Sequence, residues 1–286
     1  MPLQRLFGVV PPPALVLGGV VSVQVGGAIA KGLFAYTGPI GVVTLRLVFA
    51  GLLLVALWRP SLKLSWRAVG VVAAFGTVLG VMNFSIYLAF ERIPLGMAVT
   101  IEFLGPLLVA AFGSRRWYDG LWVLLAGAGV VLLTEGGGAV DLIGVLFAAL
   151  GGACWGGYIL LGARLGEHTP GGTGLALATV WAALLIAPFG IAESGATLWD
   201  AKLLVLAAGV AVLSSVVPYS LEIEALRRMP TSVFGVLMSL EPAVAALAGM
   251  VVLGELLAPP QWLAVGCVVV ASVGATRTAS HPPRDA

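Results

Sequence analysis

Ten apolar stretches, each close to the length that crosses a lipid bilayer, constrain this chain more than any other feature of its sequence. The hydrocarbon core of a bilayer is spanned by a helix of about 20 residues, and short segments rich in glycine, proline and charge separate the stretches. Strands of a membrane barrel would alternate apolar and polar residues, which these stretches do not do. The stretches are residues 14–35, 39–58, 67–90, 94–113, 118–134, 142–163, 174–191, 202–221, 231–251 and 260–276.

The composition indicates an all-α membrane protein with a single membrane domain over residues 1–286. Hydrophobic residues make up 60% of the chain, charged residues 10%, and the mean hydropathy is +1.07, whereas a soluble domain would be about a quarter charged. A net charge of +2 without a basic patch gives no sign of a nucleic-acid partner. The sequence shows no P-loop, no nucleophile–base spacing and no His or Cys cluster, so we expect neither an enzyme nor a metal site.

The basic residues divide unequally between the two ends of the predicted helices. The side on which the first helix begins receives eleven lysines and arginines, and the other side receives three. Cytoplasmic loops carry an excess of Lys and Arg, so we expect both termini in the cytoplasm and an even number of helices. The larger group is Arg5, Arg59, Lys63, Arg67, Arg115, Arg116, Arg164, Arg227, Arg228, Arg277 and Arg284, and the smaller group is Lys31, Arg92 and Lys202.

An internal repeat relates the segments 92–106 and 228–242, in which three features recur at one offset of 136 residues. The repeat divides the ten stretches into halves of five, residues 14–136 and 142–276. Because five is odd, the second half must enter the membrane upside down, and inverted repeats are typical of secondary transporters. A duplication without any role in transport is the alternative. The matching pairs are Arg92 with Arg228, Pro94 with Pro230, and Pro106 with Pro242.

Polar and ionisable side chains within the apolar stretches are the candidate functional residues. A charge at the centre of a membrane helix costs about 2.5–3.5 kcal/mol on insertion scales, so such groups should face a cavity. A rise of about 1.5 Å per residue places Arg46 roughly 10 Å and Glu102 roughly 12 Å from the outer surface, with Glu241 near the midplane. The candidates for binding substrate or protons are Gln24, Lys31, Arg46, Asn83, Tyr87, Glu102, Trp155, Tyr158, Tyr219, Glu222 and Glu241.

Helical spacing predicts three polar stripes among these residues. Gln24 and Lys31 are seven apart and should share one helix face. Asn83 and Tyr87 are four apart and should share another. The third stripe, toward the cytoplasmic half, has positions i, i+4 and i+7 at Ser215, Tyr219 and Glu222. We therefore expect these stripes to face a cavity.

Structural roles remain open for several of the same residues. Lys31, Arg46, Asn83 and Glu102 could meet in the outer half of the membrane. Alternatively, Lys31 and Glu222 extend their charged ends to the membrane interface, and Arg46 forms a purely structural pair with Glu102.

Two prolines at equivalent positions of the repeat predict breaks in helical bonding. Pro106 cannot donate a hydrogen bond to the carbonyl of Glu102, nor can Pro242 donate one to that of Met238. The freed carbonyls need other partners within the membrane. We expect Pro106 and Pro242 to act as hinges, with a static kink as the alternative.

Several segments resemble EamA-type members of the drug/metabolite transporter superfamily. They are IPLGMAVTIEFLGPLLVAAFGSRR from Ile93, VPYSLEIEALRRMP from Val217, and SVFGVLMSLEPAVAALAGMVVLGE, which follows shortly after it. The segment from Gln24 to Arg46 and CWGGYILLGARLG from Cys154 are similar too, so the resemblance covers nearly the whole chain. Within the superfamily, the segments are similar to the bacterial exporters of threonine and homoserine.

This resemblance implies a ten-helix exporter of the bacterial inner membrane, with two inverted halves around a central cavity. It implies export of small neutral amino acids driven by the proton gradient, without a cofactor. It also implies that Glu102, Tyr158 and Tyr219 line the cavity.

The predicted charges suit a zwitterionic amino acid. Arg46 or Lys31 could bind its carboxylate, and Glu102 or Glu241 its ammonium group. A carboxylate in a membrane interior favours its neutral form, so Glu102 or Glu241 could also exchange a proton. Other metabolites, aromatic amino acids or drug cations are alternative cargoes, a membrane scaffold or enzyme subunit is an alternative class, and the chain could act as a monomer or a homodimer.

Overall fold

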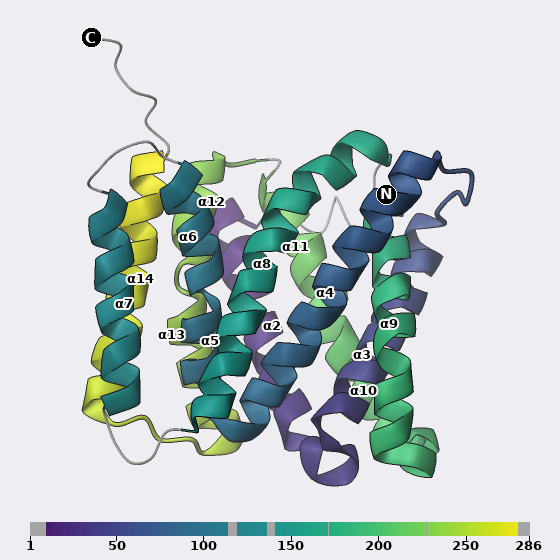
Figure 1. The fold of residues 1–286 in the computed structure, drawn as a ribbon, viewed down its shortest axis with the longest axis horizontal. Coiled ribbons are helices and arrows are strands. Elements are labelled where there is room, and N and C mark those ends of the chain that lie inside the picture. The colour runs from purple at the N-terminus through teal and green to yellow at the C-terminus, as the bar shows by residue number, and fades with distance from the viewer. Residues whose placement is uncertain (1–9, 114–118, 136–140, 171, 227, 280–286) are drawn as a thin grey trace.

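The structure is a computed structural model that describes residues 10–113, 119–135, 141–170, 172–226 and 228–279. All regular elements within these ranges are helical, and Figure 1 shows them side by side in a bundle. They are α2 (Pro12–Gly32), α3 (Phe34–Trp58), α4 (Trp66–Arg92), α5 (Leu95–Glu102), α6 (Leu104–Gly113), α7 (Asp119–Glu135), α8 (Leu142–His168), α9 (Thr173–Ser194), the 3-10 helix η1 (Gly195–Trp199), α10 (Ala201–Ala211), the π-helical turn η2 (Val212–Val216), α11 (Val217–Leu226), α12 (Thr231–Met238), α13 (Glu241–Ala248), the π-helical turn η3 (Gly249–Leu253) and α14 (Pro259–Ala279).

Eight helices of the described chain are long and apolar enough to cross a membrane. Two shorter apolar helices, Leu95–Val109 and Gly120–Leu132, fall within the predicted stretches 94–113 and 118–134. Large apolar side chains such as Leu52, Leu124 and Val205 are exposed on the outside of the bundle, where lipid would solvate them. The chain is therefore a multi-pass membrane protein, and its described residues form helices that include eight candidate spans.

The helix packing directs several elements toward the centre of the bundle. Helix α7 packs along α14 at one edge, and α3 packs along α9 near the other (Figure 1). Between these edges, α4 packs on α8, α5 packs on α8 and α13, and α2 packs on α11 and α13. The centre is thus enclosed by helices from both halves of the sequence.

Successive spans run between two ends of the bundle (Figure 1). One end, which we call the basic end, contains the α3–α4, α8–α9 and α11–α12 connections and the last turn of α14. This end carries Arg59, Lys63, Arg67, Arg164, Arg228 and Arg277, and the opposite end carries Lys31, Arg92 and Lys202. The other basic residues assigned to the first group, Arg5, Arg115, Arg116, Arg227 and Arg284, lie outside the described residues.

Helix α3 contains a sharp kink at Gly38. The sequence predicted a helix boundary at this position, but the structure places the link to α2 at Leu33 and continues α3 through Gly38. Gly38 adopts φ 73° and ψ 166°, a region that is essentially restricted to glycine. Beyond the kink the helix restarts at Pro39. The N–H of Gly41, in the first turn after the kink, donates a hydrogen bond of 2.8 Å to the Glu193 carboxylate. Glu193 therefore caps a helix that belongs to a different segment of the chain.

Replacing Gly38 with alanine should destabilise the protein by about 1–3 kcal/mol. The new Cβ would require an unfavourable backbone conformation and would also meet the Glu193 carboxylate. The thermal midpoint of the detergent-solubilised protein measures the effect. The control is Gly195→Ala, which also has a positive φ of 53° but has no atom within 4 Å of the new Cβ. A loss no larger than that of the control would show that the contact with Glu193 is unimportant.

Candidate functional site

A cavity of about 220 Å³ lies among the helices. This volume corresponds to about seven water molecules, below the roughly 300–1,000 Å³ that is usual for pockets of drug-sized ligands. Ten of the eleven predicted binding residues line it: Gln24, Arg46, Asn83, Tyr87, Glu102, Trp155, Tyr158, Tyr219, Glu222 and Glu241. Nine further lining residues were not predicted: Val23, Gly27, Met82, Ile86, Phe90, Val99, Ser214, Pro218 and Met238.

Arg46 of α3 is the one lysine or arginine among the described residues that line the cavity. Its Nη1 donates to the side-chain oxygen of Asn83, and its Nη2 donates to the carbonyl of Ser214 at 3.4 Å. The guanidinium carbon also lies 5.6 Å from the centre of the Tyr87 ring, within the range of a cation–π interaction. These contacts fix the guanidinium, while its buried Nε has no hydrogen-bond partner. Arg46 therefore retains donor capacity.

Three carboxylates from different helices face the same cavity: Glu102 of α5, Glu222 of α11 and Glu241 of α13. Glu241 accepts a hydrogen bond from Nε2 of Gln24 at 3.3 Å, and its other oxygen is buried without a partner. Within the described chain, Arg46 and Glu102 form no direct ion pair, although Arg46 attracts Glu102 at longer range. The predicted structural pair is therefore absent, and both signs of charge are available in one cavity.

Lys31 lies outside the cavity, contrary to the expectation that it would meet Arg46 and Glu102. Its Nζ is 2.6 Å from Oε1 of Glu255 and donates to the carbonyl of Ile93 at 2.8 Å. Lys31 shares a helix face with Gln24, but seven residues displace it by about 10 Å along the axis. A shared face does not give a shared depth, and Lys31 reaches the end of α2.

The predicted stripe on η2 and α11 differs from the structure at one residue. Ser214 lines the cavity in place of Ser215, because the turn η2 is π-helical and the N–H of Val217 bonds to the carbonyl of Val212, five residues before it. The sequence could have predicted an unbonded backbone carbonyl at this position. Pro218 has no N–H to donate to the carbonyl of Ser214, four residues earlier. That carbonyl instead accepts the hydrogen bond from Arg46.

The two helices that carry the predicted hinge prolines are each interrupted three residues before the proline. Phe103 separates α5 from α6 with φ −65° and ψ −12°, and Ser239 follows α12 with φ −62° and ψ −11°. The carbonyl of Glu102, which Pro106 cannot bond, lies against Gly152 of α8, a position where a side chain would meet it. Glu102 is therefore positioned by close backbone packing between α5 and α8.

Replacing Gly152 with alanine should lower stability by about 1–3 kcal/mol, the range for overpacking, and should reduce transport by displacing Glu102. The added Cβ would lie 2.6 Å from the Glu102 carbonyl oxygen. The thermal midpoint and a transport assay on the same sample would measure both effects. Gly157→Ala on the same helix is the matched control, because its nearest neighbour is a Val78 methyl group at 3.5 Å. Equal behaviour of the two variants would contradict this packing argument.

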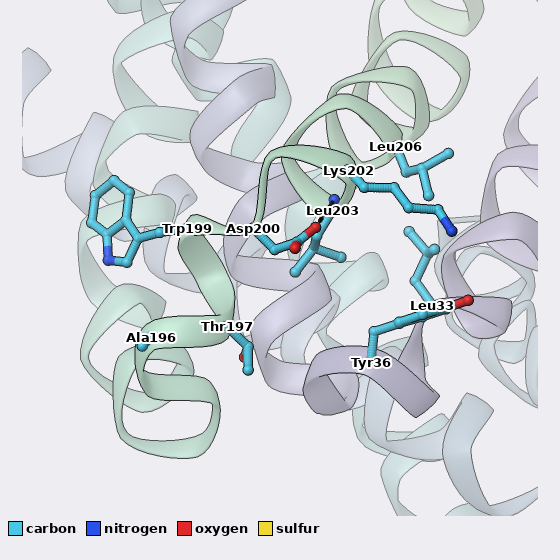
Figure 2. Close-up of a pocket in the computed structure, with 9 residues that line it drawn as sticks. All are labelled: Leu33, Tyr36, Ala196, Thr197, Trp199, Asp200, Lys202, Leu203 and Leu206. Carbon is cyan, nitrogen blue, oxygen red and sulfur yellow. Dashed lines mark hydrogen bonds between the residues drawn. The ribbon is translucent and has the colours of Figure 1, made fainter.

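A second hollow, of about 590 Å³, lies at the end of the bundle opposite the basic end, between the start of α3 and the η1–α10 segment. Figure 2 shows its lining side chains. It is lined by leucines together with Tyr36, Trp199, Asp200 and Lys202, and the ammonium group of Lys202 lies 5.7 Å from the Tyr36 ring. Asp200 accepts a hydrogen bond from the N–H of Leu203 and thereby caps α10. Tyr36 and Trp199 are 60% and 80% exposed, as is common at a membrane interface. This hollow lacks the buried charges of the inner cavity, which we take as the candidate site.

Comparison with known proteins identifies the chain. The sequence profile of the EamA-like transporter family matches residues 142–277. The threonine/homoserine exporter RhtA of Escherichia coli (strain K12) is 44% identical over 272 residues, which cover 93% of this chain and 92% of RhtA. The chain belongs to the EamA-like transporter family. The RhtA protein of Salmonella typhimurium (strain LT2) is 43% identical to this EamA-like transporter, over 96% of the chain and 94% of the relative.

The chain is also similar to a more distant relative and to a solved structure. The uncharacterized transporter YwfM of Bacillus subtilis (strain 168) is 23% identical over 78% of the EamA-like transporter described here and 71% of YwfM. One solved structure, designated only "Crystal structure of protein", superposes with a TM-score of 0.63 and 19% identity, over 93% of this chain and 96% of that chain. The fold therefore matches a solved structure along almost its whole length. The described residues of this EamA-like transporter contain no group of three or more His, Cys, Asp or Glu side chains that could hold a metal ion.

Proposed function

We propose that this EamA-like transporter exports small neutral amino acids, with threonine and homoserine as the leading substrates, in exchange for protons. The observation that carries the proposal is a cavity of about 220 Å³ lined by Arg46 and by three carboxylates. A zwitterion presents both charge signs within a small volume, so such a cavity suits it better than a bulky drug cation. The two relatives that are 43–44% identical carry the name threonine/homoserine exporter.

In the proposed binding mode, Arg46 holds the carboxylate of the substrate. The free Nε of Arg46 is the available donor, and charge-assisted hydrogen bonds from a fixed guanidinium orient a planar carboxylate well. The ammonium group then lies toward Glu102, the carboxylate that Arg46 influences electrostatically. Removal of either charge from the substrate should therefore weaken binding.

We assign proton exchange to Glu241. One of its oxygens is buried without a hydrogen-bond partner, and the other accepts a bond of 3.3 Å from Gln24. A buried carboxylate that lacks a cationic partner favours the neutral form. The positive charge of a substrate ammonium group held near Glu102, in the same cavity, would stabilise the ionised form of Glu241 and thereby couple proton release to substrate binding.

We propose that the chain forms ten membrane-spanning segments as two inverted halves, residues 14–136 and 142–276. The equivalent breaks at Phe103 and Ser239, 136 residues apart with nearly equal dihedral angles, support this symmetry. Pro106 and Pro242 would then be the hinges of the two halves. The basic end would face the cytoplasm of a bacterium with both termini on that side of the inner membrane, as the excess of Lys and Arg indicates.

A counterflow assay tests the proposal. Proteoliposomes loaded with unlabelled threonine should take up labelled threonine and homoserine, with weaker uptake of phenylalanine and none of analogues that lack the amino or carboxyl group. An imposed pH gradient should increase the accumulation of threonine. Flux of drug cations or aromatic amino acids only would favour the alternative cargoes, and absence of any flux would favour a scaffold without transport activity.

A further inference from the structure

A second ionic cluster ties together three segments at the end of the bundle opposite the basic end. The ammonium group of Lys31, in the last turn of α2, lies 2.6 Å from Oε1 of Glu255. Glu255 follows Gly254, whose left-handed conformation (φ 70°) ends the π-helical turn η3. Both side chains are mostly buried, with 18% and 17% exposure. We call this pair and its backbone contacts the Lys31–Glu255 cluster.

The side chains of both residues in the cluster bond to separate helices. Oε2 of Glu255 accepts a bond of 2.8 Å from the N–H of Leu95, in the first turn of α5, where a carboxylate interacts favourably with the helix dipole. Lys31 also donates a hydrogen bond of 2.8 Å to the carbonyl of Ile93, which begins the connection between α4 and α5. The N–H of Glu255 donates to the carbonyl of Gly249 at 3.1 Å. The cluster therefore links α2, the start of α5 and the end of α13 through η3.

Two of these helices, α5 and α13, also pack against each other beside the cavity. Gly96 of α5 packs so closely on Ala246 of α13 that a Cβ on Gly96 would lie 2.6 Å from the Ala246 Cα. Both helices also contribute cavity residues, Val99 and Glu102 from α5 and Glu241 from α13. Toward the basic end, α6 packs on α7, α8 and α14, while α12 packs on α2 and α14. Helices α5 and α13 are thus in close contact at the end of the bundle where the Lys31–Glu255 cluster lies.

We propose that the Lys31–Glu255 cluster is the outer gate of the carrier, which holds α5 against α13 while the cavity faces the cytoplasm and separates when the substrate is released outside. The proposal rests on the proposed function for its direction. Opening that end requires α5 and η3 to move apart, and this movement must break the bond from Leu95 to Glu255. Each bond of the cluster between helices involves the side chain of Lys31 or Glu255. These bonds can therefore break without unfolding a helix.

Accessibility of a cavity cysteine tests the gate. In a background with Cys154→Ser and Cys267→Ser, Val99→Cys provides a reporter on α5, and a membrane-impermeant maleimide is added from the outside. Lys31→Met or the isosteric Glu255→Gln should raise the labelling rate of the reporter at least tenfold. The double variant should label no faster than the faster single variant, because both changes open the same gate. Single variants that label as slowly as the background would overturn the proposal.

Two controls separate gating from general damage. Arg92→Met removes an ion pair to Asp141 of 3.2 Å at the same end of the bundle, but this pair does not join α5 to α13, so labelling should stay unchanged. Ala196→Cys, an exposed position on η1, should label at the same rate in every variant. An equal rise of Val99→Cys labelling in Arg92→Met would also overturn the assignment. Labelling needs no transported solute, so it tests the gate independently of whether counterflow shows threonine to be the cargo.

Discussion

Replacing Arg46 with methionine should lower threonine counterflow at low substrate concentration about a hundredfold. Truncating one partner of a buried, hydrogen-bonded charge pair costs about 2–5 kcal/mol, and a loss of about 3 kcal/mol corresponds to roughly a hundredfold at 1.4 kcal/mol per tenfold change. Arg46 is expected to have this effect because it is the one cation among the described cavity residues. Initial rates of labelled threonine uptake in proteoliposomes measure the loss.

Two control variants distinguish carboxylate recognition from a general loss of charge or folding. Arg46→Lys keeps the charge but loses the fixed fork of donors that bonds Asn83 and Ser214, so we expect an intermediate loss. Arg67→Met removes an exposed arginine at the start of α4 and should leave counterflow unchanged. If Arg46→Met folds with a normal thermal midpoint and still transports threonine at the parental rate, Arg46 does not bind the substrate.

The sequence was sufficient to predict the helical membrane fold and most of the polar side chains that line the candidate cavity. Charges such as Arg46, Glu102 and Glu241 within apolar stretches are so costly in lipid that their inward orientation follows from energetics alone. Burial energy thus specifies which side chains turn inward even where the packing partners are unknown.

The features that could not be predicted depend on local backbone geometry and on apolar packing. The π-helical turn η2 moved Ser214 into the cavity, and a periodicity of 3.6 residues cannot represent such a turn. Apolar lining residues such as Val99 and Met238 carry no signal, because an apolar side chain suits lipid, core and cavity equally. Lys31 was misplaced because its partner, Glu255, is 224 positions further along the chain. An ion pair between residues so far apart in the sequence can be identified only from the folded structure.

Replacing Glu241 with glutamine should separate exchange from proton coupling. Glutamine keeps the size of the side chain and can still bond Gln24, so counterflow of threonine should remain within about threefold of the parent, a change of less than about 0.7 kcal/mol. The side chain can no longer release a proton, so the stimulation of threonine accumulation by an imposed pH gradient should fall at least tenfold. The measurement compares accumulation with and without the gradient in the same proteoliposome preparation.

The comparison with other carboxylates decides whether this effect is specific to Glu241. Glu91→Gln, at an exposed position near the end of α4, should keep the full stimulation by the gradient. Glu102→Gln should weaken exchange itself, because Glu102 is assigned to the substrate ammonium group and not to the proton. Undiminished stimulation in Glu241→Gln would move the proton to Glu102 or Glu222, the other carboxylates of the cavity. Because an uncoupled carrier still exchanges substrate, this pattern cannot arise from a variant that fails to fold.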